Sequence, residues 1–294
     1  MDHEFGGGWT EEKLEVMRRY FSAYAQALKN QRFAKWYVDA FAGTGERTES
    51  KQTAEQSSLF GEDDAEVATS KNGSVRIALG FNPEFKKYVL IERSKARAAE
   101  LEKLKTEYPN RDIDIRLGDA NETLRSLAQS NIWRATRAAV FIDPYGMQVD
   151  WETLKALAAT KAVDIALLFP TGPLNRMLTR DGNIPPEWAK RIDDHLGECD
   201  WRNATYDETS APDLFSERTL KKKRLSTEGL RQFVLSRLKT IFPFVSDTQL
   251  ELKNSKGATL YHLFIICANP SDAAIKLADR LARSAVKLPQ KKKR

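Results

Sequence analysis

The residues that could do chemistry begin with a glycine turn that follows an apolar run. The run covers residues 35–42, is rich in β-branched and aromatic side chains, and contains one acid, Asp39. It ends in Gly43-Thr44-Gly45. Two glycines one residue apart let the backbone bend tightly and approach a ligand without a Cβ in the way. A carboxylate inside an apolar run is costly unless a polar group needs it. The stretch predicts a strand that leads into a ligand-binding turn, although a purely structural turn can carry the same pattern.

Three later apolar runs end on an acid. Glu92 closes the run 87–92, Asp119 closes 112–119, and Asp143 closes 138–143. Ligands in open α/β sheets bind outside the carboxyl ends of the strands, so these acids are expected at the same edge as the glycine turn. An ion pair or a helix cap would explain any one acid, but their convergence favours a ligand site.

Helical and strand-like segments alternate along the first part of the chain. Apolar spacings of three and four residues predict helices at 9–29, 73–79, 94–107, 121–130, 151–159, 227–240 and 271–287. Apolar runs predict strands at 35–42, 87–92, 112–119, 138–143, 162–169, 248–252 and 259–267, the last two forming a hairpin. Thr10, Ser74 and Ser94 are candidate N-caps. This order predicts an α/β fold of Rossmann type, a mostly parallel seven-stranded sheet with a C-terminal antiparallel hairpin.

The alternation stops after the fifth predicted strand, which divides the chain. Residues 1–173 are expected to hold the N-terminal helix and most of the core, and residues 227–288 to complete that core. Between them, residues 174–226 contain a Pro-Pro pair, His195 and a basic cluster, and they predict a helical insertion or cap. Residues 289–294 form a basic tail, and the polar stretch 46–72 predicts a loop.

The composition is that of a globular protein, with 41% hydrophobic and 30% charged residues. No apolar run is long enough to cross a membrane, and the N-terminus does not resemble a signal peptide, so a cytoplasmic location is expected. Two cysteines predict neither a disulfide framework nor a zinc site. The net charge of +6 hints at an anionic partner. The basic clusters 221–224 and 291–294 fit either phosphate contact or ordinary solvated surface.

Three kinds of cofactor fit a glycine turn at the end of a strand. A dinucleotide site needs a third glycine where this chain has Thr48, and an ATP-binding loop needs a Gly-Lys-Ser/Thr sequence that is absent. S-adenosylmethionine carries no phosphate and needs neither feature. It needs a close backbone approach, an acid for its ribose hydroxyls and an acceptor for its adenine amino group, and the sequence offers all three.

The segment from Asp39 to Gly45 is similar to motif I of class I S-adenosylmethionine-dependent methyltransferases, in the Phe-Ala-Gly-x-Gly form of amino-group methyltransferases. By this resemblance Asp39, Gly43 and Gly45 would hold the methionine portion of the cofactor. Glu92 would take the ribose hydroxyls and Asp119 the adenine amino group. The cofactor-binding residues implied are Asp39, Phe41, Gly43, Gly45, Glu92, Arg93, Asp119 and Ala120.

A second segment, Asp143-Pro144-Tyr145-Gly146, resembles the catalytic motif IV of the same enzymes. It lacks the second proline of the usual Asp/Asn-Pro-Pro-aromatic form. It is closer to the Asp-Pro-Phe-Gly of tRNA guanine-N2 dimethyltransferases. The resemblance implies that Asp143, Pro144 and Tyr145 are catalytic.

A wider pattern between Asp39 and Trp188 looks like the three-Cys-motif partner family (TcmP), bacterial and phage proteins typically encoded beside a three-Cys-motif protein. It consists of the Phe-Ala-Gly turn, Gly73-Ser74 with Ala78-Leu79, Gly118-Asp119, residues 141–146, residues 151–154, and residues 168–170 with Asn175-Arg176. That family usually has a proline where this chain has Thr44. The resemblance implies a methyltransferase-like fold and a three-Cys-motif protein as partner.

The residues favour methyl transfer to an exocyclic amino group, most readily that of a nucleic-acid base in tRNA or DNA. The Asp143 carboxylate and the Pro144 carbonyl could accept the two N–H bonds of that amino group. Tyr145 could stack on an extruded base or simply pack in a turn. The expected substrate-binding residues are Tyr145, Asn175, Arg176, Lys222 and Lys223, with His195 a weaker candidate.

Two other functions stay open. The chain could be a binding or regulatory subunit whose pocket survives while the partner acts. It could also be a metal-dependent phosphoryl-transfer enzyme that uses Asp39, Asp119 and Asp143. That second alternative ranks low because the acids end different strands and a metal needs its ligands on one small centre. No metal site is therefore predicted.

Overall fold

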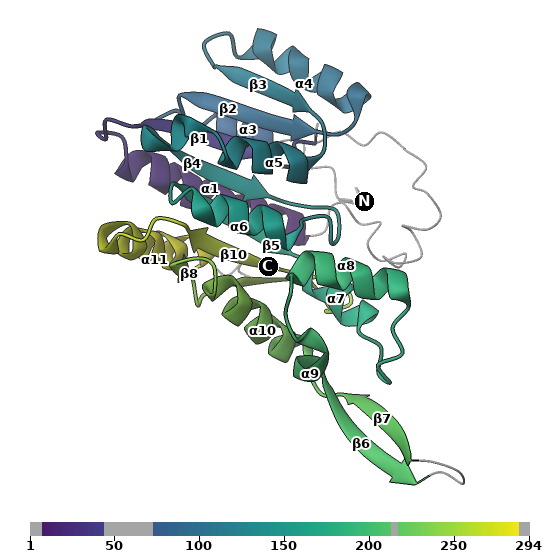
Figure 1. Ribbon diagram of the computed structural model, residues 1–294. Coiled ribbons are helices and arrows are strands. Elements are labelled where there is room, and N and C mark those ends of the chain that lie inside the picture. The colour runs from purple at the N-terminus through teal and green to yellow at the C-terminus, as the bar shows by residue number, and fades with distance from the viewer. Residues whose placement is uncertain (1–7, 44–72, 213–216, 288–294) are drawn as a thin grey trace, which may run out of the picture.

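An eight-stranded sheet crosses the computed structural model, which describes residues 8–43, 73–212 and 217–287 (Figure 1). Its strand order is β3-β2-β1-β4-β5-β10-β8, and β9 pairs with the other end of β10. The bounds are β1 Ala34–Asp39, β2 Lys87–Glu92, β3 Ile113–Leu117, β4 Thr136–Ile142, β5 Val163–Phe169, β8 Phe244–Val245, β9 Leu250–Lys253 and β10 Thr259–Cys267. Strands β1 to β5 pair in parallel and β10 runs antiparallel to β5. The predicted Rossmann-like α/β fold is confirmed.

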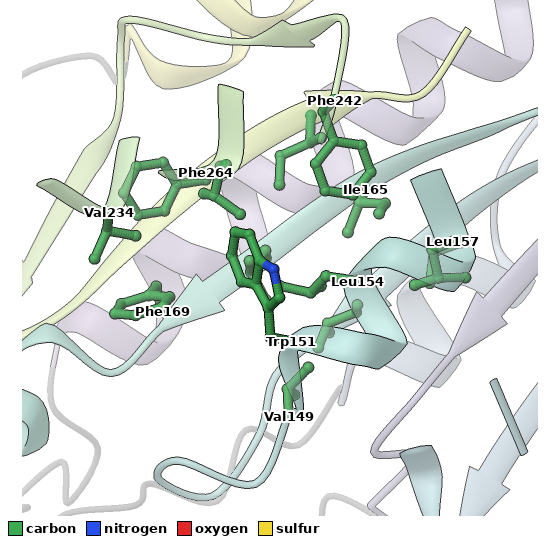
Figure 2. Close-up of a cluster of buried hydrophobic side chains, with 14 of the residues drawn as sticks. Val149, Trp151, Leu154, Leu157, Ile165, Phe169, Val234, Phe242 and Phe264 are labelled. Atoms are coloured by element: carbon green, nitrogen blue, oxygen red, sulfur yellow. The ribbon is translucent and has the colours of Figure 1, made fainter. Parts of the chain in front are cut away.

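Helices cover both faces of this sheet. The buried side chains of one face pack against α5 (Ala120–Ala128), α6 (Trp151–Ala159), α8 (Pro186–Leu196) and α10 (Thr227–Lys239). Those of the other face pack against α1 (Gly8–Ala27), α3 (Ser74–Leu79), α4 (Lys95–Glu107) and α11 (Asp272–Val286). The strands are apolar on both sides because both of their faces are covered. Figure 2 shows the ring of Trp151 inside the first layer, near Leu154, Ile165 and Phe264.

Residues of the C-terminal part belong to both core layers. Strands β9 and β10 form the expected antiparallel hairpin. Strand β8 was not predicted, because two residues are too short to show an apolar pattern. Ser271 caps α11 by accepting a hydrogen bond from the amide of Ala274.

The insertion differs from its prediction. Helices α7 (Thr171–Met177), α8 and α9 (Trp201–Thr205) are present, but the rest is an antiparallel hairpin of β6 (Tyr206–Pro212) and β7 (Glu217–Lys223). Figure 1 shows this hairpin extending away from the sheet. The helices of the predicted insertion are present, but its hairpin was not predicted, because a ribbon that extends away from the core needs no apolar alternation. The basic cluster 221–224 lies at the end of β7.

Two of the three predicted N-caps were also wrong. Thr10 lies inside α1, which begins at Gly8, because the ring of Trp9 packs against Tyr261 at 6.0 Å and the helix extends past the threonine. Gly73 occupies the N-cap position of α3, and the hydroxyl of Ser74 donates to Asp39 instead. The cap at Ser94 is confirmed, since its hydroxyl accepts from the amide of Arg97. The predicted loop 46–72 and the tail 289–294 lie outside the described residues.

A buried acid lies near the start of β5, far from the carboxyl ends of the strands. The Asp164 carboxylate accepts a hydrogen bond of 2.7 Å from the Tyr20 hydroxyl. Burial raises the pKa of Asp164 to about 6, although the Tyr20 hydrogen bond lowers it. The folded protein therefore binds a proton here over a pH range in which the unfolded chain does not.

This proton makes a testable contribution to stability. Because the folded pKa of Asp164 exceeds the unfolded value of about 3.9, its contribution is fully present below pH 4 and lost as the pH rises through 6. As the pH rises from 4 to 7, the free energy of unfolding of Asp164→Asn is expected to increase by about 3 kcal/mol relative to that of the wild type. Each pKa unit of difference between the folded and unfolded states corresponds to about 1.4 kcal/mol. Urea unfolding across this range measures the difference, with the exposed Asp247→Asn as control. A constant difference would contradict the expectation.

Candidate functional site

The glycine turn after β1 is stabilised by hydrogen bonds to Asp39. The Asp39 carboxylate is 0% exposed and accepts hydrogen bonds from the Ser74 hydroxyl (2.6 Å), the Tyr37 hydroxyl (3.2 Å) and the Phe41 amide (3.2 Å). Burial raises the pKa of Asp39 to about 6, the hydrogen bonds lower it, and the charge of Asp143 raises it further. Asp39 thus braces the turn and ties it to α3. Its contact with a cofactor stays a prediction.

The described part of the turn leaves room for a ligand. The Gly43 amide donates to the Phe41 carbonyl at 2.8 Å, which folds the chain back after the strand. A Cβ added at Gly43 would meet no described heavy atom within 4 Å. Phe41 is half-buried against the first core layer. Gly45 lies outside the described residues.

The acid at the end of β2 is largely occupied by the protein itself. Glu92 is 6% exposed and accepts from the Ser94 amide (2.7 Å) and from Nε and Nη2 of Arg97 (3.0 and 2.9 Å). A carboxylate has about four acceptor positions. The three bonds leave one position for a ribose hydroxyl while Arg97 stays in place. Neighbouring Arg93 is exposed.

The acid after β3 keeps one oxygen available. Asp119 caps α5, its Oδ1 accepting from the amides of Asn121 (2.9 Å) and Glu122 (3.2 Å). Its Oδ2 makes no hydrogen bond with the described part of the chain. Beside it lies Leu117, 51% exposed and the one large hydrophobic side chain among the described residues that is exposed. Ala120 is buried. An acceptor next to an apolar side chain suits a flat ring that bears an amino group.

The acid after β4 is held by a lysine 130 residues away. Lys13 of α1 places its Nζ 2.5 Å from Oδ2 of Asp143 and 4.9 Å from the centre of the Trp9 ring. Both side chains of the ion pair are mostly buried. Lys13 is a site residue that the sequence analysis missed. No spacing links it to Asp143, and within an amphipathic helix it looks like surface charge.

The eight residues from Asp143 to Asp150 connect β4 to α6. They are called the catalytic segment below because they begin with the three residues predicted to be catalytic. Pro144 is buried and Tyr145 half-buried. Gly146 has a φ of +72°, a left-handed conformation that glycine adopts without strain. The segment therefore turns sharply just after the three residues predicted to be catalytic.

The predicted substrate-binding residues do not all point to a ligand. The Lys223 Nζ donates to Oδ1 of Asn175 (2.7 Å) and to the carbonyls of Asn175 (2.8 Å) and Leu178 (2.9 Å). Burial lowers the pKa of Lys223. The pair Asn175–Lys223 thus joins the hairpin to the end of α7, a structural role. Arg176 and Lys222 are exposed, and their role stays a prediction.

Two of the four side chains in the basic cluster 221–224 form ion pairs. Lys221 pairs with Glu208 at 2.8 Å, and Arg224 pairs with Asp207 at 3.2 Å. Residues 174–226 contain ten basic and ten acidic side chains, so the insertion as a whole carries no net charge. The hairpin is therefore weak support for nucleic-acid contact.

His195 is buried and does not face a substrate. Its Nδ1 lies 2.6 Å from the Val149 carbonyl, which can only accept, so Nδ1 carries the proton. Burial lowers the pKa of His195 to about 4, so the ring is neutral at pH 7. Its Nε2 is buried without a hydrogen-bond partner among the described atoms. His195 supports the catalytic segment.

Neither metal chemistry nor a membrane span finds support in the described part of the chain. Those residues contain no cluster of three His, Cys, Asp or Glu side chains that could hold a metal ion. The helices that the structure describes include none that is long and apolar enough to cross a bilayer.

Comparisons with known proteins give no family. No protein-family model matches the sequence, and no curated protein matches it. The resemblance to the three-Cys-motif partner family therefore stays a prediction.

Several solved structures resemble the chain at low identity. The protein LPL1258 from Legionella pneumophila, of family model DUF519, is 13% identical, with 93% of this chain and 92% of that chain covered and a TM-score of 0.44. The N-terminal domain of EvdMO1, solved with SAH bound, is 12% identical (86% and 80% covered, TM-score 0.40). An S-adenosylmethionine-dependent methyltransferase from Clostridium acetobutylicum is 9% identical (85% and 90% covered, TM-score 0.37).

Proposed function

We propose that this chain transfers a methyl group from S-adenosylmethionine to an exocyclic amino nitrogen of a nucleic-acid base. The observation that carries the proposal is the edge of the sheet. There two of four adjacent parallel strands end in Asp39 and Glu92, and the other two are followed within two residues by Asp119 and Asp143. Ligands of open α/β sheets bind at this edge.

The residues at this edge fit the cofactor in three respects. Gly43 has no atom of the described residues within 4 Å of the position of an added Cβ, so a ligand could approach its backbone. Within the described chain, Oδ2 of Asp119 makes no hydrogen bond and could accept the adenine amino group, and Leu117, two residues earlier, is exposed. Glu92 retains one acceptor position for a ribose hydroxyl. S-adenosylmethionine would supply an electrophilic methyl group.

The chain's own residues would prepare the acceptor. An amino group on a base ring is a weak nucleophile because its lone pair is delocalised. Lys13 holds Oδ2 of Asp143, so Oδ1 and the Pro144 carbonyl are the oxygens left to accept the N–H bonds of the amino group. Accepting both bonds localises the lone pair on nitrogen, and fixed positioning supplies further acceleration. As the carbon–nitrogen bond forms, the methyl carbon–sulfur bond would break, S-adenosylhomocysteine would leave, and Oδ1 of Asp143 would take the proton that the nitrogen loses. Tyr145 would stack on the base.

A regulatory role is the second candidate, and one observation favours it. Arg97 occupies most of the Glu92 carboxylate that would bind the ribose. A pocket closed in this way suits a subunit of the methyltransferase fold that acts through a three-Cys-motif protein. Under this alternative the cofactor binds weakly or only when the partner displaces Arg97.

Calorimetric titration with S-adenosylmethionine tests the cofactor. We expect saturable binding to the wild type and a loss of about tenfold or more in Asp119→Asn, since a hydrogen bond to a charged group contributes about 1.5–3 kcal/mol. Asparagine still caps α5 through its oxygen, but its amide nitrogen cannot accept the adenine amino group. Asp200→Asn, at the N-cap of α9, is the matched control.

The same titration separates the two candidate functions. Absence of binding by folded wild-type protein would contradict the enzyme proposal and favour the partner subunit. Binding restored or strengthened in Arg97→Ala would show that Arg97 blocks the ribose position. Equal binding by Asp119→Asn and the wild type would remove Asp119 from the cofactor site.

A further inference from the structure

We infer that Asn121 is a positioning residue that couples the cofactor side of the site to the catalytic segment. The coupling rests on the proposed function, whereas the positioning of the segment does not. Asn121 follows Asp119 by two residues in α5, and its side chain reaches across to residues 148–153. Through these contacts, cofactor binding at Asp119 would restrain the backbone of the catalytic segment.

The contacts of Asn121 connect both halves. Its backbone amide donates to Oδ1 of Asp119 at 2.9 Å. Its Nδ2 donates to the Gln148 carbonyl at 2.8 Å, and its Oδ1 accepts from the Asp150 amide at 2.9 Å and the Thr153 hydroxyl at 2.8 Å. The residue is 8% exposed. Most of the hydrogen-bonding groups of Asn121 thus contact either the Asp119 carboxylate, which is proposed to bind adenine, or residues 148–153, which follow Asp143.

The geometry of the side-chain amide explains its strength as a clamp. It binds the carbonyl before Val149 and the amide after it, as a neighbouring strand binds one residue of a ladder. The two peptide groups that flank Val149 are each held by one of these bonds, so the segment cannot shift in register without breaking both. An exposed or singly bonded asparagine would not impose this constraint.

The opposite side of the catalytic segment is held by the insertion. His195 of α8 donates to the Val149 carbonyl at 2.6 Å, and Arg191 donates to the Met147 carbonyl at 3.4 Å. Three consecutive carbonyls, at residues 147, 148 and 149, therefore each have a side-chain donor. The two supports come from α8 and α5, and of these only α5 also carries the Asp119 cap.

The coupling follows from this difference. A ligand on Asp119 would fix the start of α5 through the cap, and Asn121 would pass that constraint to the catalytic segment. His195 would hold the segment whether or not the cofactor is bound. Loss of Asn121 is therefore expected to leave the cofactor affinity nearly intact while freeing the segment.

Hydrogen exchange of the full-length protein, followed by peptide mass spectrometry, tests the positioning. Without cofactor, the amides of residues 145–150 are expected to exchange about tenfold or more faster in Asn121→Ala than in the wild type. Asn121→Asp keeps the acceptor for Asp150 but puts an oxygen against the Gln148 carbonyl, so it is also expected to speed exchange. Asn203→Ala, another helical asparagine with a side-chain bond, is the control.

A second measurement at saturating S-adenosylmethionine tests the coupling. In the wild type we expect exchange of residues 145–150 to slow when the cofactor binds. In both Asn121 variants we expect binding within about threefold of the wild type, without this slowing.

The outcomes separate the positioning from the proposed function. Unchanged exchange of residues 145–150 in both variants without cofactor would overturn the inference, whatever the cofactor does. Failure of the wild type to bind S-adenosylmethionine would overturn the proposed function and the coupling, but not a positioning effect seen without cofactor. Faster exchange throughout Asn121→Ala would mean that this variant has lost its fold. The exchange of residues 145–150 in Asn121→Asp would then decide whether Asn121 positions the segment.

Discussion

Asp143→Ala is expected to lower methyl transfer by about 10²-fold or more while the affinity for S-adenosylmethionine stays within about threefold. The Asp143 carboxylate follows β4, and Lys13 fixes one of its oxygens at 2.5 Å. Its replacement removes an acceptor for the amino group without touching the residues assigned to the cofactor. Transfer of labelled methyl from S-adenosylmethionine to total tRNA, and separately to DNA, measures the rate.

Lys13 gives this experiment an internal comparison. If Lys13 acts by orienting Asp143, Lys13→Met should lower the rate, and the double variant should be little worse than Asp143→Ala alone, because residues that act as a unit are not additive. Lys13→Arg keeps the charge and should recover part of the rate. Full activity in Asp143→Ala would place catalysis elsewhere and favour the partner-subunit role.

The layout of the sheet could be predicted because its strands are buried on both faces. Residues 87–92 form one continuous apolar run, and the predicted strand has the bounds that the structure shows. Residues 151–159 likewise have their predicted bounds as a helix. The parallel order then places Glu92, Asp119 and Asp143 at one edge, so the site's location follows from the fold.

The contacts that complete the site could not be predicted in this way. Lys13 meets Asp143 only after α1 packs on one face of the sheet, which no local pattern encodes. Arg97 turns back on Glu92 across the start of α4, and Asn121 reaches another loop from α5. Each contact depends on how two elements pack. Sequence periodicity says which face of an element is buried, but not what it meets there.

The hairpin β6–β7 was not predicted because its own sequence carries too little pattern, not because it depends on how two elements pack. Its strands pair through the backbone, and most of their residues are polar in sequence. Apolar alternation reports burial on one face, so a ribbon without such a face leaves little trace. From the sequence alone, the basic cluster 221–224 therefore suggests a nucleic-acid contact. In the structure, Lys221 and Arg224 form ion pairs with acidic residues of β6.

Trp151→Ala is expected to cost about 3–5 kcal/mol of the free energy of unfolding, the largest stability effect predicted for this chain. Trp151 is 4% exposed and lies in the core layer between the sheet, α6 and α10 (Figure 2). The guanidinium of Arg237 lies 4.5 Å from the centre of its ring. The backbone of Gly197 packs so closely that an added Cβ would lie 2.2 Å from the ring.

Urea unfolding followed by far-ultraviolet circular dichroism measures this cost without relying on tryptophan fluorescence. Trp188→Ala is the matched control, since Trp188 is only partly buried at the edge of the same layer and should lose less than half as much. Equal losses in the two variants would contradict the central place given to Trp151. Because Trp151 directly follows the catalytic segment, its removal should also loosen residues 145–150. A milder Trp151→Phe variant that keeps the fold would then show whether the core layer, as well as Asn121 and His195, sets the position of Asp143.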